Sequence, residues 1–218
     1  MSLVFPPLYA IIDAALLKTS ELSFAEMMAE SGVELLQYRN KRASSRELFD
    51  ASASISARLS RLAERGAKGP RFIVNDRADI ALLAKAGGVH VGQQDLGVEE
   101  ARAIVGQGKW VGVSTHSLEQ LDAADKTSAD YIAFGPVFPT RSKENPEPVV
   151  GLDLLREARR HTRKPLVAIG GITLERAADT FNAGADSLAV AGDLIASDHP
   201  AARARLFLRE AAQARREG

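Results

Sequence analysis

Three polar side chains alternate at the end of an apolar segment near the N-terminus. Gln37, Arg39 and Lys41 lie two residues apart along the stretch LLQYRNK. In an extended strand, residues two apart point to the same side, so these side chains converge. An amide and two cations that converge can bind an anion such as a phosphate. A solvent-exposed charge pair before the next helix is the alternative, and the place of Arg39 inside the strand end favours the anion site.

Two carboxylates follow the next two apolar segments. Asp76 comes directly after Asn75, and Asp95 comes shortly after the segment that holds His90. Mg²⁺ is usually held by one or two carboxylates together with phosphate oxygens and water, so this pair beside two cations predicts a metal-bound diphosphate. The alternative roles are a helix cap for Asp76 and a turn for Asp95. His90 lies between two valines, and we interpret it as a buried core histidine.

Two later segments carry hydroxyl, imidazole and amine groups. Ser114 and His116 share a face, but no acid partner is evident for a Ser–His–Asp triad, so we interpret Ser114 as a ligand-binding hydroxyl. His116 fits a general acid–base and the cap of the following helix equally well. Thr140 and Lys143 lie in the charged, Pro-rich loop 139–150. Such a loop is either an ordinary surface connection or a lid over a ligand.

Glycines end the last two apolar segments. Gly170 and Gly171 follow one of them, and Ala191 and Gly192 follow the other. Glycine lets backbone N–H groups approach phosphate oxygens, although it also makes ordinary tight turns. In parallel barrels the loops after strands seven and eight commonly bind phosphate, so the two pairs together predict a phosphate site.

Eight short apolar segments alternate with eight amphipathic ones, which predicts a parallel sheet covered by helices. The predicted strands are 8–13, 35–39, 72–76, 88–92, 110–114, 131–137, 165–171 and 187–192, and the predicted helices are 21–31, 45–65, 77–86, 98–105, 117–126, 151–161, 173–182 and 200–216. Barrels of this class begin at ~200 residues, so the pattern favours a (β/α)8 TIM barrel, with 1–218 as a single catalytic domain. A doubly wound sheet would need G-x-G-x-x-G after the first strand, where there is none. A barrel places its active site at the carboxyl ends of the strands, where all the residues above would meet.

The composition narrows the chemistry. The chain of 218 residues has no Cys, which excludes disulfides, Cys-rich metal sites and thiolate nucleophiles. The 28 Lys and Arg residues balance 28 Asp and Glu residues, so no overall charge attracts nucleic acid or a membrane. No leader sequence and no apolar run of membrane-spanning length is evident, and we expect a cytoplasmic protein. The oligomeric state stays open, and a homo-oligomer is compatible with it.

Seven motifs, in order along almost the whole chain, resemble those of the thiamine phosphate synthase (thiamine-phosphate pyrophosphorylase) family. They are Gln37-x-Arg39-x-Lys41, Asn75-Asp76-Arg77-x-Asp79, Gly88-Val89-His90-Val91-Gly92-Gln93-x-Asp95-Leu96, Gly112-Val113-Ser114-x-His116, Gly135-Pro136-x-Phe138-x-Thr140-x-x-Lys143, Gly151-Leu152 and Ala168-Ile169-Gly170-Gly171-Ile172. The resemblance implies a transferase of thiamine biosynthesis. Such an enzyme joins hydroxymethylpyrimidine diphosphate to hydroxyethylthiazole phosphate by dissociative substitution, with Mg²⁺, and releases thiamine phosphate and diphosphate.

The resemblance also implies a role for each matching residue. Those expected to hold the pyrimidine diphosphate are Gln37, Arg39, Lys41, Asn75, Ser114 and Lys143, of which Arg39, Lys41, Ser114 and Lys143 are expected to act in catalysis. Asp76 and Asp95 are expected to bind Mg²⁺. Thr140 and Gly171 are expected to contact the thiazole phosphate. Ala191 and Gly192 are expected to contact the same phosphate because of the glycine pattern described above, although they do not match the family motif.

The chain departs from the family pattern at two positions. Ile12 stands where synthases commonly carry Thr, and Ala191-Gly192 stands where they commonly carry Ile-Ser, so one phosphate-binding hydroxyl is missing. Two other functions are compatible with this sequence. One is a thiazole tautomerase of the same superfamily, in which His116 would be the acid–base. The other is a non-catalytic sensor of thiamine precursors.

Overall fold

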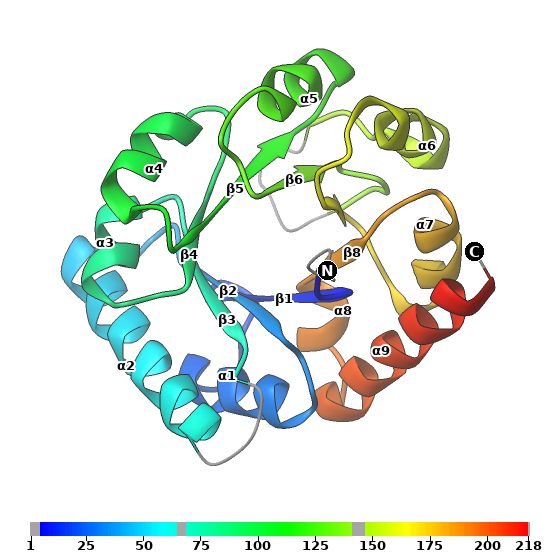
Figure 1. Cartoon of the computed structure of the whole chain (residues 1–218). Helices are drawn as coiled ribbons and strands as arrows, with labels where there is room; N and C mark the ends of the chain where they lie inside the picture. Colours follow the sequence, from blue (N-terminus) through cyan, green and yellow to red (C-terminus); the bar gives the residue numbers. More distant parts are fainter. Residues whose placement is uncertain (1–4, 65–68, 141–146, 218) are drawn as a thin grey trace.

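A computed structural model of the chain describes residues 5–64, 69–140 and 147–217. Eight parallel strands, each hydrogen-bonded to the next, form a closed barrel in chain order, and β8 pairs with β1 (Figure 1). The strands are β1 (Leu8–Asp13), β2 (Leu35–Arg39), β3 (Arg71–Asn75), β4 (Gly88–Val91), β5 (Trp110–Thr115), β6 (Tyr131–Phe134), β7 (Leu166–Ile169) and β8 (Ser187–Val190). The predicted TIM barrel is therefore confirmed.

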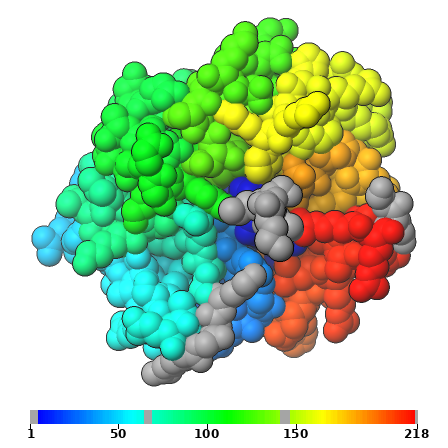
Figure 2. All heavy atoms as spheres, in the orientation of Figure 1, coloured from blue at the N-terminus to red at the C-terminus, as the bar shows by residue number. Residues whose placement is uncertain are grey.

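Helices surround the barrel as an outer ring (Figure 1). They are α1 (Glu21–Glu30), α2 (Ser45–Glu64), α3 (Ala78–Leu83), α4 (Val98–Val105), α5 (Leu118–Asp125), α6 (Gly151–His161), the 3₁₀ turn η1 (Leu174–Arg176) with α7 (Ala177–Asn182), α8 (Gly192–Ile195) and α9 (Pro200–Glu217). Figure 2 shows consecutive segments following one another around the molecule, so that α9 lies beside the N-terminal part of the chain. None of these helices, within the described ranges, has the length and apolar character that a membrane span requires.

Strand residues alternate between two apolar cores. On β1, Ala10 and Ile12 pack outward against the helices, whereas Tyr9 and Ile11 pack inside the barrel. This period of two extends to the polar strand ends, so Gln37 and Arg39 lie on the interior side of β2. The alternation thus delivers the polar residues to the mouth of the barrel.

Aromatic rings fill the barrel near the amino ends of its strands. Phe5 stacks on Trp110 with ring centroids 5.1 Å apart, and the Arg71 guanidinium lies 4.1 Å from the Trp110 ring centroid. Tyr131 contacts both Phe5 and Trp110. These rings close the barrel interior below the strand ends that carry the predicted site.

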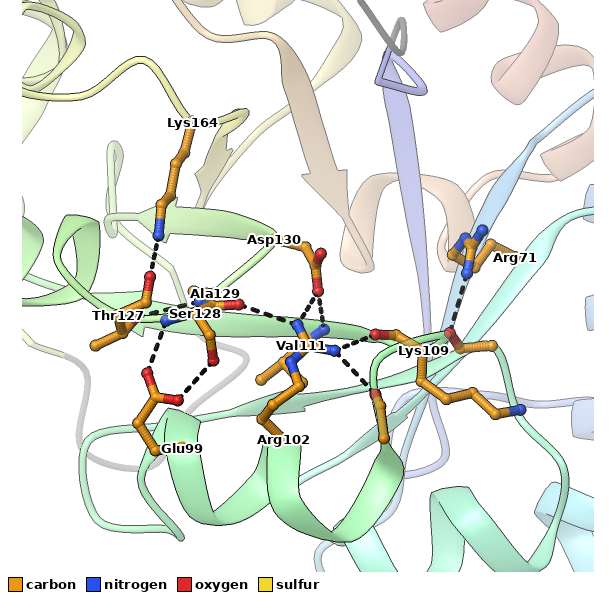
Figure 3. Close-up of polar contacts among 12 residues, drawn as sticks. Arg71, Glu99, Arg102, Lys109, Val111, Thr127, Ser128, Ala129, Asp130 and Lys164 are labelled. Atoms are coloured by element: carbon orange, nitrogen blue, oxygen red, sulfur yellow. Dashed lines mark hydrogen bonds and ion pairs between the residues drawn. The ribbon is translucent and has the colours of Figure 1, made fainter.

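An arginine clamp ties the helix α4 to the amino ends of β5 and β6 (Figure 3). Arg102 donates to the carbonyl oxygens of Gly106, Lys109 and Ser128 and pairs with Asp130. The same Asp130 carboxylate accepts the N–H of Val111 at 2.7 Å. The clamp therefore joins one helix, its following loop and two strands.

The clamp is repeated two strand–helix units later in the chain. Arg159 on α6 donates to the carbonyl oxygens of Thr162 and Lys164 and pairs with Asp186 at 2.6 Å. Asp186 in turn accepts the N–H of Leu166 at 2.8 Å. Both clamps lie at the amino end of the barrel, where residues in this fold commonly serve stability.

Several predicted boundaries change. The sixth strand ends at Phe134 rather than at 137, and the seventh covers 166–169 rather than 165–171. Two further changes bear on the site. The third strand is Arg71–Asn75 rather than 72–76, and Asp76 follows it with a positive φ of 63°. The last strand ends at Val190 rather than at Gly192, because Gly192 begins the short helix α8. A four-residue helix is too short to produce an amphipathic period in the sequence.

Candidate active site

A cavity of about 530 Å³ opens at the carboxyl ends of the strands. Predicted site residues form part of its wall, together with apolar residues such as Ile11, Ile169 and Ile172. The predicted residues that line it are Arg39, Ser114, His116, Thr140, Gly170, Gly171, Ala191 and Gly192. Eight of the positions inferred from the sequence therefore share one cavity.

Arg39 is held at the cavity wall by an acid from the neighbouring strand. The β1–β2 register pairs Asp13 with Arg39, and their side chains form an ion pair of 2.6 Å between Oδ2 and Nη1. Asp13 is buried and also accepts the N–H of Ala15 at 3.0 Å. This ion pair orients the guanidinium. Arg39 is also one of the residues that line the cavity.

Lys41, Asp76 and Asp95 meet on the adjoining arc of the same rim. Lys41 Nζ lies 2.5 Å from Asp76 Oδ2, and the side chains of Asp76 and Asp95 are close enough to share a hydrogen bond. Asp95 also accepts the N–H of Gly92 at 2.8 Å, so it closes a turn as well. The structure thus brings together the cation and the two carboxylates that were predicted to bind a metal-bound diphosphate.

The backbone and the charge of Asp76 are both unfavourable. Its φ of 63° is in the left-handed region, where such conformations cost about 1–3 kcal/mol and cluster at functional sites. Burial raises the pKa of the Asp76 carboxyl, Asp95 raises it further, and Lys41 opposes the change. The helix α3 begins after Arg77 and has no side-chain cap, so the alternative role of Asp76 as a cap is excluded.

Ser114 is bonded to a histidine inside the barrel. His90 Nε2 lies 2.8 Å from Ser114 Oγ, and His90 Nδ1 lies 3.1 Å from the Tyr131 hydroxyl. His90 is buried, as the sequence predicted. Gln37 is buried too, and its amide donates to Tyr9 at 2.6 Å, which places it inside the barrel rather than among the cavity-lining residues.

His116 lines the cavity with a defined orientation. Its Nδ1 is bonded to the carbonyl oxygen of Gly135, so that nitrogen carries the proton. The N-cap of α5 is Ser117, whose side chain accepts from the N–H of Gln120. The capping role of His116 is therefore excluded.

The predicted phosphate site lies where the loops after β7 and β8 line the cavity. Gly171 has a φ of 63°, and a Cβ there would lie 2.5 Å from the carbonyl oxygen of Pro139, so glycine is required for the close approach of the β6 and β7 loops. At Gly192 a Cβ would meet nothing within 4 Å. The short helix α8 begins at this residue, in the place where barrels commonly have an extra helix beside a phosphate.

Five of the described residues that were predicted for the site do not line the cavity, namely Gln37, Lys41, Asn75, Asp76 and Asp95. Asn75 is the last residue of β3 and is paired in register with His90. Lys143 lies outside the described residues, as does part of the loop 139–150. Within the described ranges, no group of three or more His, Cys, Asp or Glu side chains could hold a metal ion.

Sequence reasoning missed several polar residues. Asp13, Tyr9 and Tyr131 were given no role beyond their places in the predicted strands 8–13 and 131–137, because their partners come from other strands. Arg176 also lines the cavity, donates to the carbonyl oxygen of Gly171 at 2.7 Å and lies 4.5 Å from the Phe138 ring centroid. Its position just after the glycine loop of β7 was the one available signal.

Comparison with known proteins gives consistent results. A family model described as thiamine monophosphate synthase matches residues 8–194. A thiamine-phosphate synthase of Koribacter versatilis is 47% identical over 211 residues, which cover 94% of this chain and 96% of the relative. A thiamine-phosphate synthase of Chloroflexus aurantiacus is 41% identical over 91% of this chain and 89% of its own.

A solved structure agrees with these relatives. The chain of a thiamine phosphate pyrophosphorylase from Pyrococcus furiosus superposes with a TM-score of 0.83 at 29% identity. The match covers 95% of this chain and 96% of that one. The similarity therefore extends over the whole barrel.

Proposed function

This chain belongs to the thiamine monophosphate synthase family and is a transferase that forms thiamine phosphate, and from that premise we propose how its residues divide the reaction between two ends of one rim. The observation that carries the proposal is the group Lys41, Asp76 and Asp95 beside a cavity that ends at Gly171 and Gly192. One end suits a metal-bound diphosphate and the other suits a phosphate.

The pyrimidine diphosphate belongs at the end formed by β2, β3 and β4. Arg39, Lys41 and Asn75 bind its phosphate oxygens, and Ser114 hydrogen-bonds to the same substrate. Gln37 is buried and acts from inside the barrel. Lys143 completes this set in the family motif, although it lies outside the described residues.

Asp76 and Asp95 fit a divalent cation. Two adjacent carboxylates, with the pKa of Asp76 raised by burial and by Asp95, are stabilised by a positive charge between them. With no third acid in the described cluster, the remaining ligands would be phosphate oxygens and water, which is the donor set that Mg²⁺ prefers. When bound, Mg²⁺ supplies charge that stabilises the departing diphosphate.

The thiazole phosphate belongs at the end formed by β6, β7 and β8. Gly171, Ala191 and Gly192 offer backbone N–H groups, and Thr140 offers a hydroxyl. Because Gly192 carries no side chain, binding at this end relies on the backbone more than in relatives that have Ser there.

The reaction is a substitution at the methylene carbon of the pyrimidine. The bond from this carbon to the diphosphate oxygen breaks and its electron pair leaves with the diphosphate, whose charge Arg39 and Lys41 stabilise. The lone pair of the thiazole nitrogen then forms the new carbon–nitrogen bond. The reaction therefore needs no nucleophile from the protein. Apolar walls such as Ile11, Ile169 and Ile172 keep water from capturing the pyrimidine cation.

An assay of the purified protein with both precursors tests this proposal. We expect thiamine phosphate and diphosphate in equal amounts, formation that stops with EDTA and resumes with Mg²⁺, and Mn²⁺ binding by EPR that Asp76→Asn abolishes. Absence of thiamine phosphate would overturn the proposal. Thiazole isomerisation without metal would instead indicate the tautomerase, and precursor binding without turnover would indicate the sensor.

We propose that the protein acts in the cytoplasm on these small molecules, as its sequence predicted. A homo-oligomer also stays a prediction, which size-exclusion chromatography with light scattering would test.

A further inference from the structure

A hydrogen-bonded chain crosses the barrel interior and ends on Ser114. Gln37 Nε2 donates to the Tyr9 hydroxyl at 2.6 Å, and the hydroxyls of Tyr9 and Tyr131 lie 2.9 Å apart. Tyr131 is bonded to His90 Nδ1 at 3.1 Å, and His90 Nε2 is bonded to Ser114 Oγ at 2.8 Å. The five residues come from β2, β1, β6, β4 and β5.

The amide at one end determines which way every proton in this chain points. A side-chain amide nitrogen can only donate, so the Tyr9 oxygen accepts from Gln37. Either hydroxyl could donate in the Tyr9–Tyr131 bond, but Tyr131 is the one remaining partner of the buried Tyr9 hydroxyl among the described residues, so Tyr9 turns its own proton to Tyr131. Tyr131, having accepted, donates its proton to His90 Nδ1. A neutral imidazole that accepts at Nδ1 carries its proton on Nε2 and donates to Ser114. Ser114 is then left with its own proton for another acceptor.

We propose that His90 is a positioning residue, held as the Nε2–H tautomer so that the Ser114 hydroxyl donates into the cavity rather than accepting from it. The inference rests on the proposed role of Ser114 as a substrate contact. It extends that role, because it gives the hydroxyl a direction. A hydroxyl with a fixed direction selects a substrate acceptor, such as a phosphate oxygen or a ring nitrogen, over a donor.

The surroundings of these hydrogen-bonded side chains favour this arrangement of protons. Burial raises the pKa of both phenols, so Tyr9 and Tyr131 keep their protons. The Tyr131 ring stacks on His90 with centroids 5.5 Å apart. A Cβ at Gly112 would lie 2.0 Å from the Tyr131 ring, so glycine at that position leaves the space in which Tyr131 reaches His90.

Nitrogen NMR of the ¹⁵N-histidine-labelled protein tests the tautomer directly, without any substrate. We expect the His90 signals of a neutral ring protonated at Nε2. Tyr131→Phe removes the donor to Nδ1 and is expected to let the Nδ1–H form appear. Tyr9→Phe is the matched control, since it deletes an equally buried hydroxyl but leaves Tyr131 with His90 as its acceptor, and the Nε2–H form is expected to persist. A His90 that carries its proton on Nδ1 in the unaltered protein would overturn the proposal.

Kinetics then separate positioning from a purely structural role. Tyr131→Phe is expected to lower kcat/KM by about two- to tenfold, the usual worth of one hydrogen bond. In a Ser114→Ala background, the same change is expected to cost nothing further. Equal losses in both backgrounds would overturn the positioning role. The proposed substrate contact fails separately, if Ser114→Ala alone keeps full activity while the tautomer is as expected.

Discussion

Two arginines, one at each end of the barrel, use their guanidinium groups in opposite ways. Arg102 at the amino end has a side chain that is 7% exposed, and it donates four hydrogen bonds to acceptors of its own protein (Figure 3). Arg39 at the carboxyl end has a side chain that is 19% exposed, and Asp13 is the one acceptor it has among the described residues. Both are paired with an aspartate, yet only Arg39 lines a cavity.

The difference shows how a structural cation can be told from a functional one. A guanidinium whose two terminal nitrogens each donate twice within the protein stabilises the fold and has little left for a ligand, whereas one held by a single acid is oriented and keeps donors for an anion. An aspartate at the amino end and one at the carboxyl end also differ in their surroundings. Asp130 accepts from Arg102 and from Val111, but Asp76 faces Asp95, a like charge, in a strained backbone. A site that keeps such unfavourable features needs a ligand to offset them.

The largest effect is expected from breaking the amino-end clamp. Arg102→Leu removes one donor from Asp130 and one from each of three carbonyl oxygens, and we expect the free energy of unfolding to fall by about 3–5 kcal/mol, or about 1 kcal/mol for each of the four hydrogen bonds. Turnover per folded molecule at 25 °C is expected to stay unchanged. Urea unfolding followed by circular dichroism, together with steady-state kinetics, measures the two quantities.

Arg39→Leu is the matched control at the opposite end. It removes the charge partner of the buried Asp13, so we expect a loss of stability here as well. The loss of kcat/KM is expected to be about 10²–10³-fold, as for other preorganised donors to a developing charge. A loss of activity in Arg102→Leu comparable to that in Arg39→Leu would remove the distinction between the two ends.

Asp76→Asn is expected to separate activity from stability. Asn keeps the shape and tolerates a positive φ, but it binds Mg²⁺ poorly, so we expect kcat to fall by about 10²–10³-fold. Near-normal turnover would instead return Asp76 to an ordinary turn role. Steady-state kinetics at saturating Mg²⁺ decides between these outcomes.

The pH dependence of this variant follows from the raised pKa of Asp76. A carboxyl whose pKa is higher in the folded than in the unfolded state costs stability where it is ionised, and costs nothing below its ordinary pKa of 3.8. The native protein should therefore lose this part of its stability as the pH rises through the raised pKa. Asp76→Asn should be at least as stable as the native protein at pH 7, and this advantage should vanish below pH 3.8.

How far the sequence predicts this structure depends on the range of each interaction. The eight strand–helix units and the strand-end residues follow from local periodicity, and eight of those residues share the cavity. The Asp13–Arg39 pair depends on the register of two strands, and the Tyr9–Tyr131 hydrogen bond joins residues 122 positions apart. The local sequence pattern does not indicate which distant residue each of these side chains contacts. It also gives no sign that Asp76 would adopt a left-handed conformation instead of capping a helix.

His116→Ala is expected to have a smaller effect. The ring lines the cavity and is held by Gly135, but the substitution reaction has no proton for it to transfer. We expect kcat to fall by less than about tenfold, well short of the ~10²–10⁴-fold contribution of a positioned acid–base. A larger loss in the coupling assay, with the fold intact by circular dichroism, would give His116 a chemical role and would favour the tautomerase mechanism.

Gly192→Ser is expected to have the smallest effect. It adds a hydroxyl donor at the carboxyl end of the barrel, where Arg39 also keeps donors for a ligand. A Cβ at Gly192 meets nothing within 4 Å, so a serine side chain fits there without displacing a neighbour. We expect the KM for the thiazole phosphate to fall by about two- to tenfold, the usual worth of one hydrogen bond, with kcat and stability unchanged. Gly192→Ala is the matched control, because it adds the same Cβ without the hydroxyl. If the two variants have the same KM, the thiazole phosphate does not bind at Gly192, and the comparison between the two ends of the barrel would then rest on the diphosphate residues alone.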